Sequence, residues 1–343
     1  MHRRQLLSLL PAAAASTAWP LSGAARAATP GLLPLRFTLD FRITGQTSPF
    51  FLAQAKGYYR AEGLDVSIDT GAGSVASITR VASGAYDLGL GDISALIEFQ
   101  SRNGDAVKAI FQYYNRAPFV IIGRKDRGIT TDFHSLKGKR VAAAAVESTR
   151  RLWPMVERKL KLGGNFFEWV TTDFSVRDNV MVRGDVDAAT YFHDSAISLF
   201  ARMPPAELSV LPYANAGLDL YGNAVLASRK LIAEHPQALR GFLRATTRAI
   251  KETLAHPEAA LAALKQREPI LDLAVERQRW GITRGYVATA ETRSEGLGGV
   301  HMAHVGRQIA GVTETFGLSS APTGAQLYDL SFLPPLAERL VKA

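Results

Sequence analysis

Short apolar runs alternate with amphipathic stretches along most of the chain, and this alternation predicts β-strands that are each followed by a helix. In the first part of the chain, the predicted strands are residues 35–41, 64–69, 87–90 and 107–113. The predicted helices between them are residues 49–62, 74–83 and 93–102. Strands separated by helices of this length are typical of parallel βαβ units with right-handed crossovers.

The alternation restarts after residue 118 and predicts a second series of strands. These strands are residues 119–123, 140–144, 167–170, 188–191 and 208–212, and residues 149–160 are a helix with Pro154 in its first turns. From residue 238 onward the pattern is mostly helical, over residues 238–255, 257–265 and 271–286. Two α/β series without a long Gly/Ser linker predict two lobes joined by crossing strands.

The first 27 residues have the pattern of a secretory signal peptide. Arg3-Arg4 precede an apolar stretch over residues 6–21, and Ala25-Arg26-Ala27 supplies small residues for cleavage before Ala28. Serine and proline residues interrupt the stretch, whereas a membrane-spanning helix needs about 20 apolar residues. The adjacent arginines fit both a twin-arginine signal and an ordinary secretory signal, so the export route stays open. We expect a periplasmic protein that has lost residues 1–27.

Composition removes several kinds of site from consideration. The chain of 343 residues has no cysteine, which excludes disulfides, zinc–thiolate sites and cysteine nucleophiles. Removal of the predicted signal peptide leaves 37 basic and 31 acidic residues, a net charge of +6. The basic residues lack the dense clustering of nucleic-acid-binding proteins, so we expect no nucleic-acid partner. We also expect no cofactor and no metal.

Seven short motifs follow one another along the chain. They are Phe51-Leu-Ala-Gln-Ala-Lys-Gly-Tyr-Tyr-Arg-Ala-Glu-Gly-Leu-Asp-Val66, Gly71-Ala-Gly-Ser74, Val81-Ala-Ser-Gly-Ala-Tyr-Asp-Leu-Gly89, Gly91-Asp-Ile-Ser94, Leu136-Lys-Gly-Lys-Arg-Val141, Val182-Arg-Gly-Asp-Val-Asp-Ala188 and Tyr221-Gly-Asn223. In order and spacing this set resembles the NMT1/THI5-like solute-binding proteins, which are related to the sulfonate and taurine binders. The resemblance covers about residues 35–335.

This resemblance implies the type II periplasmic binding fold, in which two α/β lobes are joined by hinge strands and hold the ligand in a central cleft. We accordingly expect residues 34–116 and 217–343 in the first lobe and residues 117–216 in the second. The implied function is that of a monomeric periplasmic solute-binding protein. Its implied partners are a small heteroaromatic ligand, such as a thiamine-precursor pyrimidine, or an anionic ligand, and the membrane permease of an ABC importer.

The expected ligand contacts lie in loops at the carboxyl ends of strands, because such loops converge on the cleft. Asp40 accepts from a ring amine or from loop amides, and Phe41 stacks on a planar ligand or belongs to the core. The two tyrosines at 113 and 114 stack on an aromatic ligand or form a core pair. Ser74 and Asp92 contact the ligand, cap a helix, or do both. The expected contacts of the first lobe are Asp40, Phe41, Thr44, Ser48, Ser74, Asp92, Tyr113, Tyr114, Tyr221 and Asn223.

In the second lobe, residues 147–151 follow a strand and open a helix. Hydroxyl groups, helix amides and an arginine at this position favour a carboxylate, sulfonate or phosphate. Either Arg150 or Arg151 is the expected arginine, and the other faces solvent. His193 is expected to be structural. The expected contacts of this lobe are Ser148, Thr149, Arg150, Tyr191 and Asp194.

The sequence favours binding over catalysis. It has no Gly-x-Ser-x-Gly elbow and no metalloprotease motif, so we expect no catalytic residues. The resemblance extends to eukaryotic pyrimidine synthases, which carry a Cys-rich iron-binding motif and a histidine just before the first helix, where this chain has Thr47. An enzyme of the pyrimidine synthase type is therefore a disfavoured alternative. A periplasmic ligand sensor is the other, disfavoured because no downstream signalling segment is evident.

The predicted signal peptide is tested by the terminus of the exported protein. We expect N-terminal sequencing of the periplasmic fraction to begin near Ala28, because Ala25-Arg26-Ala27 fits the cleavage rule. If the twin-arginine route is used, replacing Arg3 and Arg4 by lysine blocks export sharply, whereas a mild effect indicates the general secretory route. An intact Met1 terminus in the membrane fraction would contradict the cleaved signal peptide.

Overall fold

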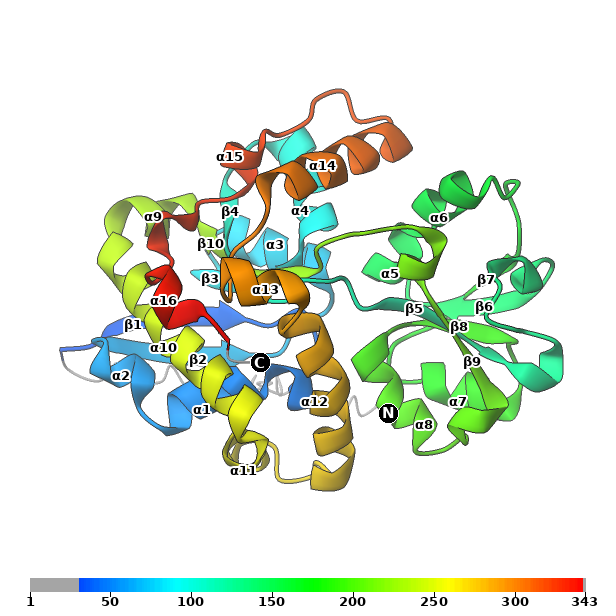
Figure 1. The fold of residues 1–343 in the computed structure, drawn as a ribbon, viewed down its shortest axis with the longest axis horizontal. Helices are drawn as coiled ribbons and strands as arrows, with labels where there is room; N and C mark the ends of the chain where they lie inside the picture. Colours follow the sequence, from blue (N-terminus) through cyan, green and yellow to red (C-terminus); the bar gives the residue numbers. More distant parts are fainter. Residues whose placement is uncertain (1–30, 342–343) are drawn as a thin grey trace, which may run out of the picture.

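The computed structural model describes residues 31–341, so the predicted signal peptide lies outside the described residues. The described chain forms two lobes side by side, each built on one five-stranded sheet with helices on both faces (Figure 1). This is the two-lobed α/β architecture that the sequence predicts. Among residues 31–341, no helix is both long and apolar enough to cross a bilayer.

The sheet of the first lobe has the strand order β2-β1-β3-β10-β4. Its strands are β1 Leu33–Thr38, β2 Leu64–Asp69, β3 Leu88–Asp92, β4 Val107–Gln112 and β10 Asn223–Ser228. Strand β1 pairs in parallel with β2 and β3, whereas β10 lies antiparallel to both β3 and β4. The late strand β10 thus returns to a sheet whose other strands come from the first 112 residues.

The sheet of the second lobe repeats this arrangement in the order β7-β6-β8-β5-β9. Its strands are β5 Phe119–Arg124, β6 Arg140–Ala143, β7 Glu168–Thr171, β8 Ala188–Phe192 and β9 Leu208–Pro212. The parallel pairing predicted from the βαβ pattern is confirmed for β6, β7 and β8. It is wrong for β5, which is antiparallel to β8 and β9 because it enters its sheet from the opposite end after leaving the first lobe.

Two predicted helices are each broken into two. The helix predicted over residues 49–62 forms two helices, α1 Ser48–Ala55 and α2 Tyr58–Ala61. The break occurs because Gly57 adopts the left-handed conformation at φ 68°, which ends the first helix. The helix predicted over residues 149–160 forms α5 Ser148–Arg151 and α6 Trp153–Leu160. Pro154 stands in the first turn of α6, where a missing N–H costs nothing.

The helices predicted after residue 238 are confirmed with ends shifted by a few residues, and several others were not predicted. The remaining helices of the first lobe are α3 Ser74–Ala82, α4 Ile93–Asn103, α9 Arg229–Glu234, α10 Pro236–Ala255, α11 Pro257–Arg267, α12 Leu273–Val287, α13 Ala290–Glu295, α14 Met302–Phe316, α15 Gly324–Leu327 and α16 Leu336–Arg339. Those of the second lobe are α7 Arg177–Arg183 and α8 Ile197–Phe200. The 3-10 turns are η1 Gly45–Thr47, η2 Lys125–Arg127, η3 Phe133–Leu136, η4 His193–Ala196, η5 Pro205–Glu207, η6 Tyr213–Ala216 and η7 Leu330–Phe332.

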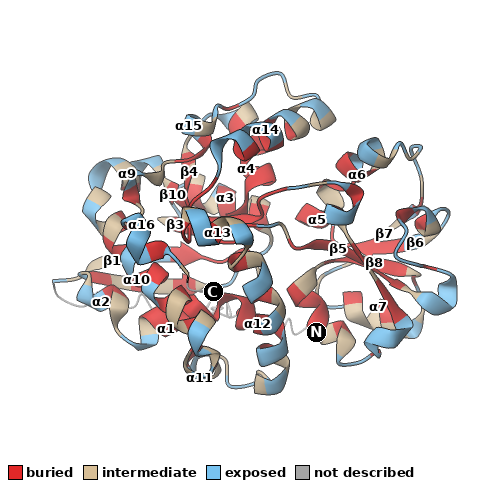
Figure 2. Ribbon diagram, in the orientation of Figure 1, coloured by how far each residue is buried: buried red, intermediate tan, exposed pale blue. Residues whose placement is uncertain are grey.

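The inner strands β3, β5, β8 and β10 are buried along nearly their whole length, whereas the edge strands β2 and β7 are only partly buried (Figure 2). In the first lobe the side chain of Phe37 on β1 packs edge-on against Phe50 of α1 and Phe242 of α10, with ring centroids 5.0 and 5.6 Å apart. The rings of Tyr59 and Phe242 stack at 5.0 Å. Helices α1, α2 and α10 thereby cover one face of the sheet.

The chain passes between the lobes twice, over residues 113–118 and residues 213–222. These crossings are hydrogen-bonded to each other: Ala117 N donates to Leu220 O at 2.8 Å, and Gly222 N donates to Tyr114 O at 2.9 Å. The predicted lobe boundaries at 116/117 and 216/217 fall within these two segments and stay predictions. Because both crossings are short and paired, they hold the two sheets at a defined separation.

The loops that follow β1 and β2 fit together only because residue 71 is a glycine. Gly71 N donates to Phe41 O at 2.9 Å, and Gly73 N donates to Asp40 O at 2.7 Å. A Cβ atom at position 71 would stand 1.9 Å from the carbonyl oxygen of Leu39. The two loops are therefore in backbone contact at the edge of the sheet that faces the second lobe.

We expect Gly71→Ala to lower the free energy of unfolding by about 1–3 kcal/mol, because the backbone of one loop must move away from the other. Urea unfolding followed by circular dichroism measures this change. Gly163→Ala is the matched control, since no atom lies within 4 Å of a Cβ built there. A Gly71→Ala protein as stable as the parent would contradict the close approach of the loops.

Candidate functional site

A cavity with about 400 Å³ of empty space lies between the lobes, and both lobes contribute to its lining. The lining residues follow the carboxyl ends of β1, β2, β6, β7 and β8, where loops of parallel strands converge. From the first lobe they are Asp40, Phe41, Gln46, Gly73 and Ser74, and from the second lobe Glu147, Ser148, Phe174, Arg177, Phe192 and Ser195.

Aromatic rings from both lobes form the apolar walls of the cavity. Phe41 of the first lobe and Phe174 of the second meet edge to face with their centroids 5.1 Å apart. Phe192, at the end of β8, is the third ring in the lining. The guanidinium of Arg42 lies 4.9 Å from the centroid of Phe41. A flat apolar ligand can therefore contact ring faces or edges contributed by both lobes.

Asp40 is a buried acidic group in the cavity with a strongly perturbed pKa. Its side chain is 5% exposed, its Oδ2 accepts a hydrogen bond from Asn223 Nδ2 at 2.6 Å, and its Oδ1 has no partner among the described residues. Burial raises the pKa of Asp40 to about 7, although the bond from Asn223 opposes that rise. Near neutral pH the carboxyl therefore exchanges between a form that only accepts and a form that also donates.

In the first-lobe lining of the cavity, two further buried polar atoms lack partners among residues 31–341. They are Gln46 Oε1 and Ser74 Oγ, and both residues line the cavity. The backbone carbonyl of Gln46 is held by Tyr113, whose hydroxyl donates to it at 2.5 Å. An unsatisfied buried group costs about 1–3 kcal/mol. Together with Asp40 these atoms make the first-lobe wall rich in acceptors and suited to a ligand that carries N–H or O–H groups.

The second lobe contributes a buried ion pair. Arg177 Nη1 donates to Glu147 Oε1 at 2.8 Å, and Glu147 Oε2 also accepts from the Thr190 hydroxyl at 2.8 Å. Burial by itself would lower the pKa of Arg177, but Glu147, Tyr191 and Asp178 together outweigh burial and raise that pKa. The guanidinium lies 3.9 Å from the ring centroid of Tyr191, and its Nε has no partner among the described residues. Arg177 is thus the cation of the cavity.

The expected contacts left out seven of the lining residues, which are Gln46, Gly73, Glu147, Phe174, Arg177, Phe192 and Ser195. The residues of the ion pair are 30 positions apart, so neither local spacing nor periodicity joins them. The one available signal was position: Phe174 and Arg177 follow the strand at 168–171 just as Asp40 and Phe41 follow the first strand. Applying the rule of strand ends to every strand would have included this loop.

Four of the predicted contacts line the cavity: Asp40, Phe41, Ser74 and Ser148. Ser74 does not act as a helix cap, since the residue before α3 is Gly73 and no side chain caps that helix. Asp92, in contrast, caps α4, because its Oδ1 accepts from Ala95 N at 3.0 Å. Thr44 and Ser48 are buried beside η1, and their hydroxyls have no partner among the described residues.

Tyr113, Tyr114 and Asn223 lie behind the cavity wall instead of in it. Both tyrosine rings are buried in the core, where they pack on each other at 5.1 Å, so the faces available to a ligand belong to the three phenylalanines. The hydroxyl of Tyr114 donates to Asp194 Oδ2 of the second lobe at 2.5 Å. Asn223 acts through Asp40, whose carboxyl it holds. These three residues position the lining.

The remaining predicted residues of the second lobe are directed elsewhere. Arg150 donates to Thr171 Oγ1 at 2.9 Å, and its guanidinium lies 5.0 Å from the ring centroid of Trp169, outside the cavity lining. Arg151, the alternative to Arg150, pairs with Glu98 of the first lobe at 2.7 Å. Thr149 donates to the Tyr191 carbonyl, and the Tyr191 hydroxyl donates to Asp178. Ligand contact by Arg150, Thr149 and Tyr191 stays a prediction without support from the lining.

Asp194 connects the second lobe to the first, and Tyr221 connects the second crossing to α13. Asp194 accepts from Tyr114 and also from Thr283 Oγ1 at 2.9 Å, while its backbone oxygen accepts from Arg279 at 2.7 Å. Three first-lobe side chains thus converge on one buried second-lobe residue. Tyr221, in the second crossing, donates its hydroxyl to Glu291 of α13. Neither residue lines the cavity, and their assignment as ligand contacts also stays a prediction.

One pair of histidines has a spacing that occurs in metal sites. His301 and His304 have the His-x-x-His spacing of many metal sites, which the expectation of no metal overlooked. His304 packs on the Tyr221 ring at 4.1 Å, and its Nε2 contacts the Asp219 backbone oxygen at 2.9 Å. Within residues 31–341 no group of three or more His, Asp or Glu side chains has a geometry that could hold a metal.

A protein-family model described as NMT1/THI5 like matches residues 44–260. Among curated relatives, the 4-amino-5-hydroxymethyl-2-methylpyrimidine phosphate synthase of Candida albicans is 27% identical over 78% of this chain and 79% of its own length. The riboflavin-binding protein RibY of Chloroflexus aurantiacus is 26% identical over 92% of this chain and 90% of its own length.

Solved structures show the same fold at low sequence identity. The ligand-binding component of an ABC-type import system from Staphylococcus aureus matches with a TM-score of 0.66 and 9% identity, over 87% of this chain and 97% of that chain. The periplasmic aliphatic sulphonate-binding protein SsuA of Escherichia coli matches with a TM-score of 0.64 and 17% identity, over 92% of this chain and 93% of that chain. The predicted periplasmic binding fold is therefore confirmed.

The raised pKa of Asp40 predicts how stability depends on pH. The folded state keeps a proton that the unfolded state releases above about pH 4, so the stability from protonated Asp40 is complete below pH 3.8 and is lost as pH rises through about 7. We expect the parent to lose about 2–3 kcal/mol relative to Asp40→Asn between about pH 5 and pH 8.

Urea unfolding of both proteins at the two pH values measures this difference. Asp92, whose pKa burial also raises to about 7, is present in both proteins, and since Asp40 is the smallest cause of that rise, most of its contribution cancels. If the free energy of unfolding depends on pH in the same way in the parent and in Asp40→Asn, burial does not raise the pKa of Asp40, and the prediction is wrong.

Proposed function

This chain belongs to the NMT1/THI5-like family, and on that premise we propose that it is a periplasmic solute-binding protein that captures a nitrogen-bearing heteroaromatic ligand between its lobes and delivers it to an ABC importer. The observation that carries the proposal is the cavity itself. Aromatic rings and acceptor atoms from opposite lobes meet around one space, so a ligand in it contacts both lobes at once.

The class of ligand follows from the two kinds of lining. Phe41, Phe174 and Phe192 favour a planar ring, and the free oxygens of Asp40 and Gln46 favour N–H groups on that ring. The names of two relatives are consistent with such a ligand, since one is a pyrimidine phosphate synthase and another a riboflavin-binding protein. An aminopyrimidine or a larger ring system that contains a pyrimidine unit is the ligand class that we propose.

An anionic ligand is the competing class, and Arg177 is the residue that favours it. Its unpartnered Nε is available for a charge-assisted hydrogen bond, which is typically stronger than a neutral one. Glu147 already neutralises much of that charge at 2.8 Å, however, and Asp40 would repel a second anion when it is ionised. The balance of charge in the cavity therefore favours a neutral ligand or one with a small acceptor group near Arg177.

Catalysis is the second candidate function, because several relatives are named as pyrimidine phosphate synthases. The sequence has no cysteine, whereas the resemblance implies a Cys-rich motif in the eukaryotic synthases, and Thr47 replaces their histidine. The Thr47 hydroxyl donates to the Thr44 carbonyl at 3.0 Å and serves the η1 turn. We therefore propose binding without turnover.

Transport also implies a location and a partner. A periplasmic location depends on export through residues 1–27, and delivery to a permease depends on a surface that both lobes present. The names of structural neighbours, an ABC-type import component and a sulphonate-binding protein, support this setting. We propose a monomer with the two lobes divided near residues 116 and 216.

The proposed function is tested by native mass spectrometry of protein purified without refolding, followed by calorimetry with an aminopyrimidine, riboflavin and an alkanesulfonate. We expect a heteroaromatic compound to bind, and Phe174→Ala to weaken it about ten-fold or more, because an aromatic wall is lost. Arg150→Gln is the matched control and should bind like the parent, since Arg150 lies outside the lining.

Other results would redirect or contradict the proposal. Binding of the sulfonate alone, weakened by salt and by Arg177→Gln, would indicate the anionic class. Formation of a pyrimidine phosphate from pyridoxal phosphate in the same preparation would indicate an enzyme. No bound compound and no heat with any candidate ligand would contradict a solute-binding role for this cavity.

A further inference from the structure

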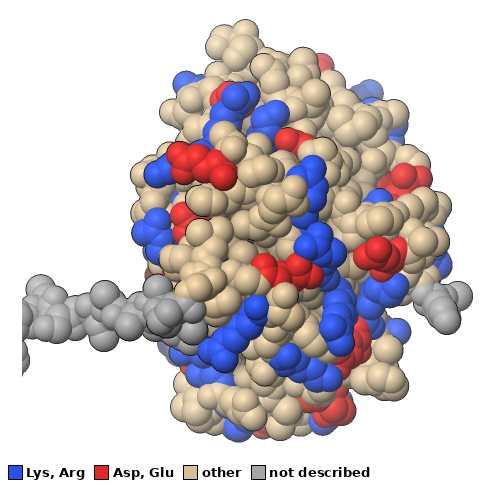
Figure 3. Space-filling view, turned by 90° about the vertical axis from the view of Figure 1, so that its left-hand side faces the viewer, with Lys and Arg blue, Asp and Glu red and all other residues tan. Residues whose placement is uncertain are grey.

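A second recess lies on the first lobe, on a different surface from the inter-lobe cavity. It is a groove with about 880 Å³ of empty space between α2, α10 and residues 334–338, and it shares no lining residue with the inter-lobe cavity. Figure 3 shows a run of Lys and Arg side chains down the face of the molecule that carries α2. Nothing in the proposed transport function requires a site here.

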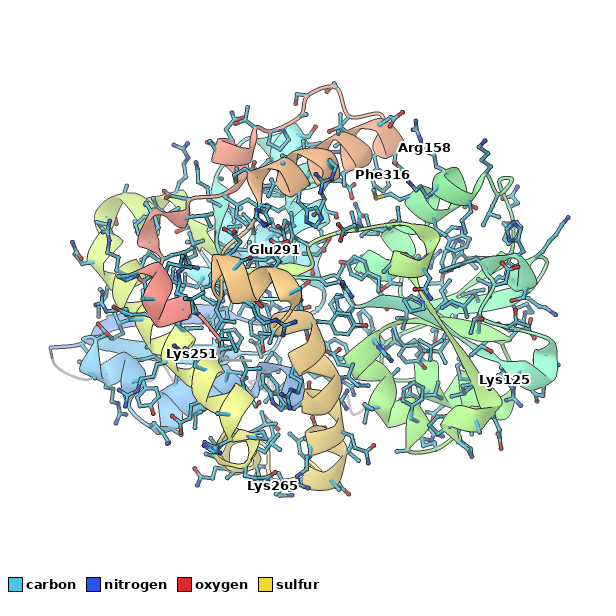
Figure 4. All side chains as sticks on the ribbon, viewed as in Figure 1. Lys125, Arg158, Lys251, Lys265, Glu291 and Phe316 are labelled. Atoms are coloured by element: carbon cyan, nitrogen blue, oxygen red, sulfur yellow. The ribbon has the colours of Figure 1, made fainter. Side chains whose placement is uncertain are left out.

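One face of α10 supplies most of the groove. Arg244, Thr247, Arg248 and Lys251 are spaced i, i+3, i+4 and i+7, so the helix places all four on one stripe. Figure 4 labels Lys251 on this helix. Tyr58 of α2 closes the other side, and the guanidinium of Arg248 lies 4.0 Å from its ring centroid. The stripe therefore presents three cations and one hydroxyl to a common space.

The cations differ in how far they are already neutralised. Arg244 forms two hydrogen bonds to Glu62, at 3.1 and 2.5 Å, so its charge is already neutralised by that carboxylate. Lys251 donates one of its three N–H groups to the backbone oxygen of Glu338 at 2.8 Å and keeps two. Arg248 has neither an ion pair nor a hydrogen bond among the described residues. Three cations against the carboxylates of Glu62 and Glu338 leave the lining net positive.

A buried hydroxyl points to an absent partner independently of the charges. Thr247 is 3% exposed, and its Oγ1 has no hydrogen-bond partner among the described residues. Other buried threonines of the same helix are satisfied, since Thr253 donates to the Ala249 carbonyl and Thr246 bonds to the Tyr59 hydroxyl. A ligand oxygen in the groove would satisfy Thr247 while it accepts from Arg248 and Lys251.

We propose that this groove is a binding site for an oxyanion of the phosphate class, held by Arg248, Lys251 and Thr247. A guanidinium, an ammonium and a hydroxyl together offer several N–H and O–H donors and no obligatory acceptor, which is the set that phosphate oxygens match. The aromatic ring of Tyr58, whose centroid lies 4.0 Å from the Arg248 guanidinium, helps to hold that group in place. Free phosphate, a phosphate ester and a phospholipid headgroup all present this chemistry.

The direct test is a titration of isotope-labelled protein with inorganic phosphate, following backbone amide resonances of α10 by NMR at constant ionic strength. We expect saturable shifts at residues 247, 248 and 251. Arg248→Gln should raise the dissociation constant about ten-fold or more, because a charge-assisted bond is lost. Thr247→Val, which keeps the shape and removes the hydroxyl, should raise it about three- to ten-fold.

Lys230→Gln on α9 is the matched control: it removes one exposed cation outside the groove and should leave the dissociation constant unchanged. Circular dichroism and affinity for the inter-lobe ligand show that each variant is folded. An unchanged constant in Arg248→Gln would overturn the site, and so would a parent that shows neither saturable shifts nor binding to anionic vesicles. Either result leaves the proposed transport function untouched, because that function depends on the other cavity.

Vesicles distinguish the sources of the oxyanion. The parent protein is sedimented with phosphatidylglycerol vesicles and with phosphatidylcholine vesicles. Sedimentation with the phosphatidylglycerol vesicles alone, together with its loss in Arg248→Gln, would support the site and assign a lipid headgroup. Phosphate binding without vesicle binding would support the site and assign a free phosphate or phosphate ester. A protein that binds neither phosphate nor anionic vesicles has no such site.

Discussion

The two crossings between the lobes are the constraint on which the rest of this structure depends. They are bound to each other by the backbone bonds from Ala117 to Leu220 and from Gly222 to Tyr114. Because both are short, the carboxyl ends of β1 and β2 are brought opposite those of β6, β7 and β8. Every lining residue of the cavity lies at or just after one of these facing strand ends. The antiparallel strands β5 and β10 are its other consequence, since each enters a sheet directly after a crossing.

Burial makes the chemistry of the cavity different from what its residue types suggest. An aspartate, a glutamate and an arginine in water would make a charged site. Here desolvation raises the pKa of Asp40 to about 7, and Glu147 and Arg177 neutralise each other at 2.8 Å. The cavity is therefore nearly neutral and aromatic, with directional acceptors. Under the proposed function, this balance would decide which ligands fit, and not the net positive charge of the chain.

Much of the fold could be predicted from the sequence because strands buried on both faces are short uniform apolar runs. Residues 208–212 and 119–123 match β9 and β5 almost residue for residue. Strand β10 was missed because Asn223–Ser228 reads as a short run between a turn and a helix, and only pairing with β3 and β4 identifies it. Strand direction also depends on such long-range pairing, which explains the wrong prediction for β5.

The candidate site was predicted less completely, for the same reason. Asp40, Phe41, Ser74 and Ser148 were found because they directly follow strands or open helices. Arg150 was preferred over Arg177 because it adjoins serine and threonine in sequence, yet its guanidinium stacks on Trp169. What selects Arg177 is a glutamate 30 residues away and a tyrosine ring beneath it. Partners of this kind are visible only in three dimensions.

The contacts of Asp194 with Tyr114, Thr283 and Arg279 have a consequence for affinity. These bonds join the lobes through protein atoms alone, so they stabilise the present arrangement of the lobes whatever occupies the cavity. An apparent affinity is the intrinsic affinity multiplied by the fraction of molecules already in the binding-competent form. Changes at Asp194 or Thr283 would therefore retune how tightly every ligand is held, by the same factor, and leave the order of preference among ligands intact. Under the proposed binding function, selectivity and strength of capture would thus be set by separate residues.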